Sequence, residues 1–199
     1  MLTAFKPIRQ LYDWTLGLAA HKHASWALCG ISFAESSFFP IPPDLMLIPM
    51  TIANRAKAWW YATICTASSV AGGLAGYAIG YFAFEYIGAP IIAFYGLTEQ
   101  MAGFQQSYSE HGLLIVLIAG FTPLPYKLIT IASGVFSYAL LPFTIASIVS
   151  RGARFFLVAG LLYFFGQPIR TFIEKHFELL TIAFTLALIG GFVAIKYLI

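Results

Sequence analysis

Two carboxylates, Glu35 and Asp44, stand on either side of a proline-rich segment in an otherwise apolar part of the sequence. An ionisable side chain held at membrane depth is costly, which makes it a candidate functional group. Low-dielectric surroundings favour the protonated form of a carboxyl group, so either residue could accept and release a proton. The alternative is structural: Glu35 would cap N–H groups freed by the break, and Asp44 would N-cap the following helix.

Three cations complement these carboxylates. Lys127 follows a second proline-rich segment, and Arg151 and Arg154, three residues apart, share one face of a helix. Their partners are either Glu35 and Asp44, in a structural ion-pair network, or an anionic substrate such as a phosphate, which arginine binds with a bidentate fork. Because the three cations exceed the two carboxylates by one, an anion has room to bind.

The composition indicates that these charges lie in a membrane. The chain has 199 residues, of which 60% are hydrophobic and 10% are charged, whereas about a quarter of the residues in a soluble domain are charged. The net charge of +3 is scattered, without the basic cluster of a nucleic-acid-binding protein. We therefore expect a single all-α integral membrane domain over residues 1–199, with no nucleic-acid partner.

Two apolar regions, 24–53 and 113–138, are cut by prolines into halves that are too short to cross a bilayer. Proline lacks a backbone N–H and disfavours helix at the preceding residue, so each region should fold as helix, break, helix. Backbone groups opened at membrane depth must lie inside the protein or beside a wet cavity. Both regions are therefore predicted to be re-entrant hairpins, with the breaks at Pro40, Pro42, Pro43, Pro123 and Pro125.

Three other stretches are long enough to be transmembrane helices. Residues 58–84 are uncharged and would form a helix of roughly 40 Å, longer than a hydrocarbon core of about 30 Å. Residues 179–199 contain a single charged residue, Lys196. Residues 141–166 are also apolar, except for the two arginines within them. Within 58–84, glycines recur every fourth residue, a spacing typical of close helix packing; they are Gly72, Gly76 and Gly80.

The two proline-rich segments also indicate an internal repeat. A shift of 83 residues places Pro40 on Pro123, Pro42 on Pro125 and Asp44 on Lys127. If each hairpin returns to the side from which it enters, the single span 58–84 between them inverts the second hairpin relative to the first. Inverted repeats of this kind are typical of transporters.

Charge predicts the orientation of the repeat. Residues 85–112 carry three glutamates and no lysine or arginine, which indicates a connector outside the cell. Basic residues flank 24–53 and follow 141–166, on the predicted cytoplasmic side, where we also place the N-terminus. Residues 1–23 favour an interfacial amphipathic helix. Residues 98–110 favour either a similar helix or an ordinary polar connector.

The sequence shows none of the usual enzymatic patterns. It contains no HExxH motif, P-loop or nucleophile elbow, and its two cysteines lack metal or redox spacing. We therefore expect neither an enzyme nor a bound metal or cofactor.

The motifs together resemble one known family. E-S-S-F-F-P-I-P-P-D from Glu35, G-F-T-P-L-P-Y-K from Gly120, S-G at 133–134 and S-R-G-A-R-F from Ser150 are similar to the bacterial DedA family, also called VTT or SNARE-associated membrane proteins. The resemblance covers roughly residues 25–166 and is strongest to the short YqaA-like branch.

The resemblance implies two oppositely oriented re-entrant hairpins and movement of undecaprenyl phosphate or phospholipid across the bacterial inner membrane, dependent on the proton-motive force. It places the family's hairpin carboxylates on Glu35 and Asp44. The sequence departs from the family in one respect. Many members carry an arginine before the proline of the second hairpin and another just after it, in an F-x-P-G-x-R pattern. Here Gly120 stands near the first of these positions, and the nearest cation to the second is Lys127, one residue later. Substrate identity therefore does not carry over.

These observations together predict a lipid-phosphate transporter. Lys127, Arg151 and Arg154 would hold the anionic head group while Glu35 and Asp44 exchange protons. Two alternatives stay open: an ion-coupled transporter of a small solute, and a non-transporting membrane assembly factor whose internal charges are structural. Assembly into a homo-oligomer also stays open.

Overall fold

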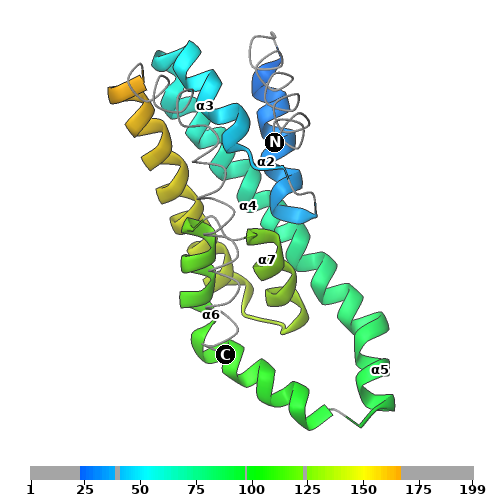
Figure 1. Cartoon of the computed structure of the whole chain (residues 1–199). Coiled ribbons are helices and arrows are strands. Elements are labelled where there is room, and N and C mark those ends of the chain that lie inside the picture. Colours follow the sequence, from blue (N-terminus) through cyan, green and yellow to red (C-terminus); the bar gives the residue numbers. More distant parts are fainter. Residues whose placement is uncertain (1–22, 39–40, 97, 123–124, 167–199) are drawn as a thin grey trace, which may run out of the picture.

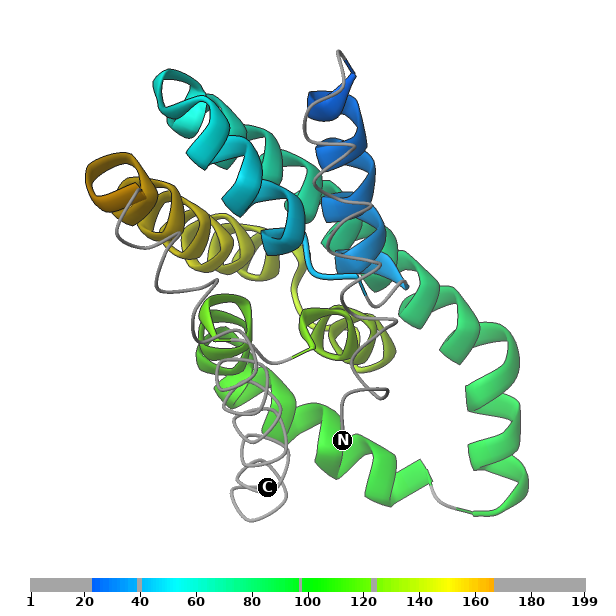
Figure 2. The same ribbon diagram turned by 45° about the horizontal axis from the view of Figure 1, so that its top comes forward.

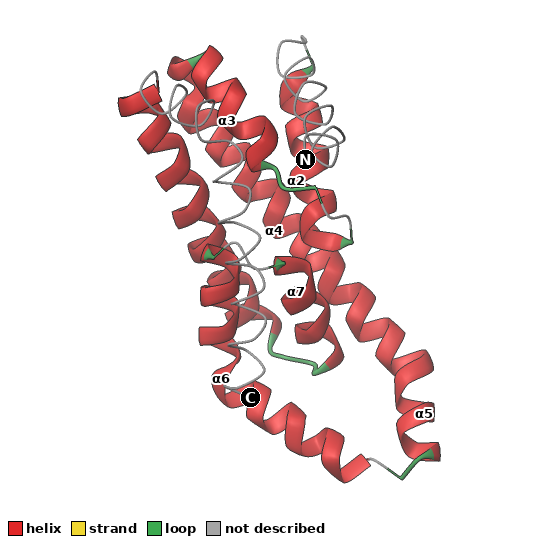
Figure 3. Ribbon diagram, viewed as in Figure 1, coloured by secondary structure: helices red, strands yellow, loops and turns green. Residues whose placement is uncertain are grey.

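The computed structural model describes residues 23–38, 41–96, 98–122 and 125–166, and within them it contains helices and connecting loops but no strand (Figure 3). The elements are α2 (Ala24–Ser37), α3 (Asp44–Ala53), η1 (Arg55–Lys57), α4 (Ala58–Ala83), η2 (Phe84–Gly88), α5 (Ala89–Phe94), α6 (Thr98–Phe121), α7 (Tyr126–Val135) and a final helix, Leu140–Gly166. The predicted interfacial helix (1–23) and the predicted span 179–199 lie outside the described residues, except for His23.

Both proline-rich segments break the chain between two helices, as predicted. The first hairpin consists of α2 and α3, and Pro43 is the N-cap residue of α3. The second consists of α6 and α7, and Pro125 is the N-cap residue of α7. Pro42 lies in the first break, whereas Pro40 and Pro123 are outside the described residues. Proline suits these positions because the first N–H groups of a helix have no intrahelical acceptor.

The two hairpins point in opposite directions. In Figure 1, α2 and α3 extend to one end of the molecule and α6 and α7 to the other, so that the two breaks meet beside the middle of α4. The turned view in Figure 2 shows α7 lying between α4 and α6. This arrangement agrees with the inverted repeat expected from the shift of 83 residues.

Glycines on α4 allow it to pack closely against both hairpins. A Cβ atom on Gly72 would collide with the main-chain carbonyl of Phe33 on α2, and one on Gly80 would collide with that of Ile131 on α7. Gly76 lies between them and faces both hairpins. The predicted packing role of the glycine stripe is therefore confirmed.

The predicted polar connector 85–112 is helical over residues 85–94 and 98–112, which corrects the boundary of the second hairpin. The helix that begins at Arg55 continues through η2 and α5 to Phe94, and α6 already begins at Thr98 rather than at the predicted Leu113. Polar residues are compatible with an exposed helix, where i,i+4 pairs such as Gln106 and Glu110 hydrogen-bond to each other. Residues 98–110 are thus part of a helix and not an irregular connector.

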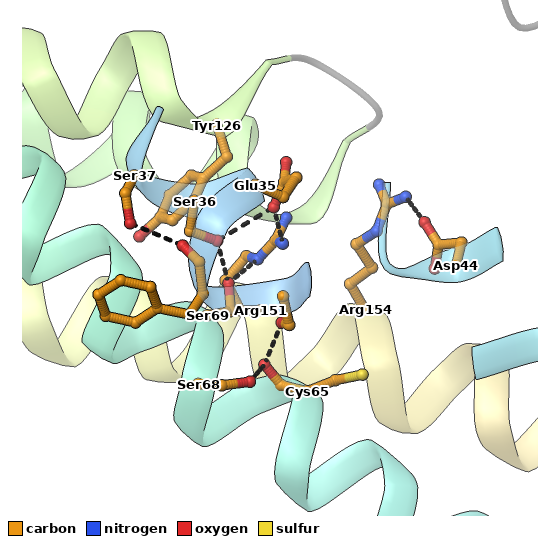
Figure 4. Close-up of polar contacts among 12 residues, drawn as sticks. Glu35, Ser36, Ser37, Asp44, Cys65, Ser68, Ser69, Tyr126, Arg151 and Arg154 are labelled. Atoms are coloured by element: carbon orange, nitrogen blue, oxygen red, sulfur yellow. Dashed lines mark hydrogen bonds and ion pairs between the residues drawn. The ribbon is translucent and has the colours of Figure 1, made fainter. Parts of the chain in front are cut away.

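Two of the described helices are long and apolar enough to cross a membrane, Arg55–Phe94 and Leu140–Gly166. The second forms one continuous helix over the predicted span 141–166, because Pro142 stands in its first turn, where no N–H is needed. Its two arginines do not interrupt it, since both point towards the first hairpin (Figure 4).

Candidate functional site

The helix Leu140–Gly166 has a polar face turned towards the hairpins and an apolar face turned away from them. Ser147, Ser150 and Arg151 are buried, whereas Val149 and Leu157 are about half exposed. The residues therefore have the opposite distribution to that of a helix on the surface of a soluble protein, where polar side chains face outward.

Arg151 forms an ion pair with Glu35 from the end of α2. The guanidinium Nη2 lies 2.6 Å from Glu35 Oε2, and Nε donates to the hydroxyl of Ser69 on α4 at 2.6 Å. The hydroxyl of Ser36 donates to Glu35 Oε2 at 3.0 Å and shares a hydrogen bond of 2.7 Å with Ser69 (Figure 4). Two serines therefore connect the carboxylate to the guanidinium in a closed network.

Two aromatic rings surround the same guanidinium. Its central carbon lies 4.9 Å from the ring centre of Tyr126 and 4.7 Å from that of Phe155. Cation–π attraction at this range strengthens when the groups are removed from water. The hydroxyl of Tyr126 donates to Ser147, so the ring is held in place from the helix that carries Arg151.

Arg154 joins the breaks of the two hairpins. Its Nη2 pairs with Oδ2 of Asp44, the first residue of α3, and its Nη1 donates to the main-chain carbonyl of Thr122, which follows α6, at 2.9 Å. The Thr122 carbonyl lies at the C-terminus of α6, where no N–H of the helix is available to it, and Arg154 supplies the missing donor.

The second pair leaves hydrogen-bonding capacity unused. Arg154 Nε and Asp44 Oδ1 are buried atoms without a hydrogen-bond partner among the described residues. The Arg154 and Asp44 side chains are 17% and 18% exposed, against 3% for Arg151. The Arg154–Asp44 pair thus has fewer hydrogen bonds than its atoms could make, whereas the Arg151–Glu35 pair has additional partners in Ser36 and Ser69.

The structure brings together four of the five charged residues predicted for the site. The proposed capping role of Asp44 is wrong, because Pro43 is the N-cap residue and Asp44 lies in the first turn of α3, directed to Arg154. Glu35 likewise binds Arg151 and Ser36, and its carboxylate makes no hydrogen bond to a backbone N–H group within the described residues. Lys127 lies in the first turn of α7, half-buried, and its amine makes no ion pair within the described residues.

Sequence reasoning missed the polar residues that complete the network, Ser36, Ser69 and Tyr126. A serine in an apolar helix commonly bonds to its own backbone, as Ser68 does to the carbonyl of Ile64. Nothing in the sequence distinguishes Ser69, which accepts from Arg151, from its neighbour Ser68, which bonds to its own helix.

This arrangement places two guanidinium groups beside two carboxylates, and guanidinium groups are suited to binding an anion. Within the described residues, no group of three His, Cys, Asp or Glu side chains could hold a metal ion. Two guanidinium groups, each neutralised by a carboxylate, can accept an anion when the carboxylate is protonated or moves away.

No family model and no solved structure matches the sequence. A Haemophilus influenzae protein named only as uncharacterized is 39% identical over 170 residues, which make up 85% of this chain and 88% of that protein. A Histophilus somni protein, named as an uncharacterized homolog, is 37% identical over 175 residues, 84% of this chain and 87% of that protein. The chain belongs to the same family as these two proteins.

Proposed function

We propose that the protein is an integral membrane transporter of the DedA type that moves a lipid phosphate, such as undecaprenyl phosphate or a phospholipid, across the bacterial inner membrane. The observation that carries the proposal is the double ion pair itself. Arg151 and Arg154 on one apolar helix meet Glu35 and Asp44, and Arg154 also contacts the second hairpin at Thr122.

The outer surface supports a location in the bilayer. Trp26 is 77% exposed, Leu141 is 71% exposed and Phe164 is 69% exposed, although several serines and threonines and one arginine are buried. Large apolar side chains exposed to this degree are unfavourable in water and favourable against lipid chains. A lipid substrate could keep its tail in the bilayer while its head group enters the polar interior.

Proton exchange on the carboxylates would drive the cycle. When a carboxylate oxygen takes up a proton, it loses its charge and releases the paired guanidinium, which then binds a phosphate oxygen. Loss of that proton restores the carboxylate, which competes with the phosphate and displaces it. Each transport event would thus couple a change in protonation to a change of arginine partner.

Reconstitution of the purified protein in liposomes tests the proposal. Fluorescent analogues of undecaprenyl phosphate and phosphatidic acid are followed between leaflets, with and without a pH gradient. We expect the wild type to accelerate their movement, and Glu35→Gln and Asp44→Asn to slow it. Glu110→Gln, an exposed substitution of the same kind on α6, serves as the matched control. Failure of the wild type with every lipid phosphate would contradict the proposal.

A second candidate function follows from the same contacts. Both arginines are neutralised within the protein, as in a structural ion-pair network. A non-transporting assembly factor built in this way would lose cellular abundance and function together when either pair is broken. A transport site would lose function while abundance stays normal, and immunoblotting beside complementation separates the two.

A further inference from the structure

We infer that the phosphate binds to Arg154 in exchange for Asp44, and that Arg151 is a positioning residue that holds the hairpins together. The inference rests on the proposed function and assigns unequal roles to the two arginines that the sequence treats alike. The ligand it requires is a phosphate with two free oxygens, either on a lipid or in solution.

Arg151 has little capacity left for a ligand. Its Nε and Nη2 donate to Ser69 and Glu35, and its plane is covered by the rings of Tyr126 and Phe155. Only 3% of its side chain is exposed. A phosphate would have to break several short contacts within a closed network in order to reach it.

Arg154 has hydrogen-bonding capacity to spare, and its side chain is more exposed than that of Arg151, 17% against 3%. Its Nη2 binds a single oxygen of Asp44, and its Nε has no partner among the described residues. Nε and Nη2 form one edge of the guanidinium, and this edge presents two parallel donors to a carboxylate or phosphate. A phosphate in place of Asp44 would fill both donors, whereas the present pair fills one.

The carboxylate of Asp44 is suited to release Arg154 in exchange for a phosphate. Its Oδ1 is buried without a partner among the described residues, so its carboxylate has lost solvation on that side. Uptake of one proton from water on Asp44 removes its charge and breaks the pair, and release of the same proton restores it. Arg154 stays anchored throughout, because its Nη1 remains bonded to the carbonyl of Thr122.

The test compares two double variants that each remove one ion pair without leaving a buried charge unpaired. They are Asp44→Asn with Arg154→Gln, and Glu35→Gln with Arg151→Gln. The protein is placed in phosphatidylcholine nanodiscs, and its thermal unfolding is followed while either phosphatidic acid in the disc or inorganic phosphate in the buffer is increased. Arg154→Lys is a third variant, which keeps the charge but lacks the two-donor edge. Glu110→Gln is the control.

We expect phosphate to raise the wild-type unfolding temperature. The Asp44/Arg154 variant and Arg154→Lys should each need about tenfold more ligand or higher for half the effect, because charge-assisted hydrogen bonds are lost. The Glu35/Arg151 variant should unfold at a lower temperature and lose less ligand affinity than the Asp44/Arg154 variant. Response to phosphatidic acid alone would assign the site to a lipid head group, and response to both would assign it to phosphate in general.

The outcomes separate the inference from the proposed function. A wild type that responds to neither form of phosphate overturns both. A wild type that responds, together with an Arg154→Lys protein of unchanged affinity, overturns the inference and leaves lipid-phosphate transport standing. The same conclusion follows if the Glu35/Arg151 variant loses more affinity than the Asp44/Arg154 variant. Arg154→Lys keeps the test decisive even if a double variant does not fold.

Discussion

The hydroxyl of Thr130 on α7 lies 3.1 Å from the main-chain carbonyl of Ser36 on α2 and shares its proton between that carbonyl and the Lys127 carbonyl of its own helix, at 2.9 Å. In a continuous helix, the Ser36 carbonyl would accept from the residue four positions later, but this residue is Pro40, which has no N–H. The break in the first hairpin thus creates an acceptor that the second hairpin satisfies. The two hairpins are joined through the backbone as well as through the ion pairs.

Replacement of Thr130 by valine tests this link. Valine preserves the shape of the side chain but leaves the buried Ser36 carbonyl without this donor. We expect the free energy of unfolding to fall by about 1 to 3 kcal/mol. Thr144→Val is the matched control, because the Thr144 hydroxyl donates only within its own helix, to Leu140, at an exposed position. Denaturant unfolding in detergent measures both, and equal losses would argue against the link.

Gly80→Ala tests the contact of α4 with the second hairpin. A Cβ atom at position 80 has no room beside the main chain of Ile131, and a backbone cannot move aside as a flexible side chain does. We expect a loss of about 1 to 3 kcal/mol, typical of overpacking. Gly30→Ala should have the opposite sign, since nothing lies within 4 Å of the new atom and alanine favours helix by up to about 1 kcal/mol. Thermal unfolding of the two variants distinguishes steric exclusion from helix propensity.

The breaks and the glycine contacts were predictable because their causes are local. A missing N–H at proline and a missing Cβ at glycine act on the chain wherever they stand, so residue type and spacing were enough. A different argument, the cost of a charge at membrane depth, predicted that Glu35, Asp44, Lys127, Arg151 and Arg154 share one interior. The structure brings all of these except Lys127 into ion pairs.

The choice of partners was not predictable. Glu35 lies 116 positions from Arg151, and Asp44 lies 110 positions from Arg154. Either carboxylate could have paired with either arginine on the grounds of charge alone, and only the packing of α2 and α3 against the final helix decides between them. The helical structure of 98–110 was also left open, because polar composition alone does not separate an exposed helix from a connector.

Ser69→Ala tests the closed network around Arg151. The substitution removes the acceptor of Arg151 Nε and a partner of Ser36 in a buried site. We expect a loss of about 1 to 3 kcal/mol in the free energy of unfolding. Ser107→Ala removes a hydrogen bond at an exposed position of α6 and should change it by less than about 0.5 kcal/mol. If the two variants unfold alike, the Ser69 contact carries little stability.

The opposite orientation of the hairpins predicts opposite labelling across a membrane. Asn54 directly follows α3 of the first hairpin, Ala139 lies in the connection between α7 of the second hairpin and the final helix, and both residues are exposed. The two hairpins extend in opposite directions (Figure 1). In a Cys29→Ser background, in which Cys65 is fully buried, single cysteines at these positions are labelled with an impermeant maleimide. We expect position 139 to react in intact spheroplasts and position 54 only in inverted vesicles. Reaction of both from one side would contradict the inverted arrangement.

Substitution of Lys127 can change phosphate binding without changing stability, which substitution of the paired arginines cannot do. Lys127 is half-buried, and its amine has no ion-pair partner in the described part of the chain, so Lys127→Gln leaves no carboxylate uncompensated. We expect the free energy of unfolding to change by less than about 0.5 kcal/mol, in the range of surface substitutions. If Lys127 attracts the phosphate towards the site, transport of lipid phosphate in liposomes should slow, and the loss should be smaller at high salt because screening already weakens the attraction. Lys57→Gln, at an exposed position before α4, is the matched control for loss of a positive charge. An equal effect of both substitutions would reduce the role of Lys127 to that of general surface charge.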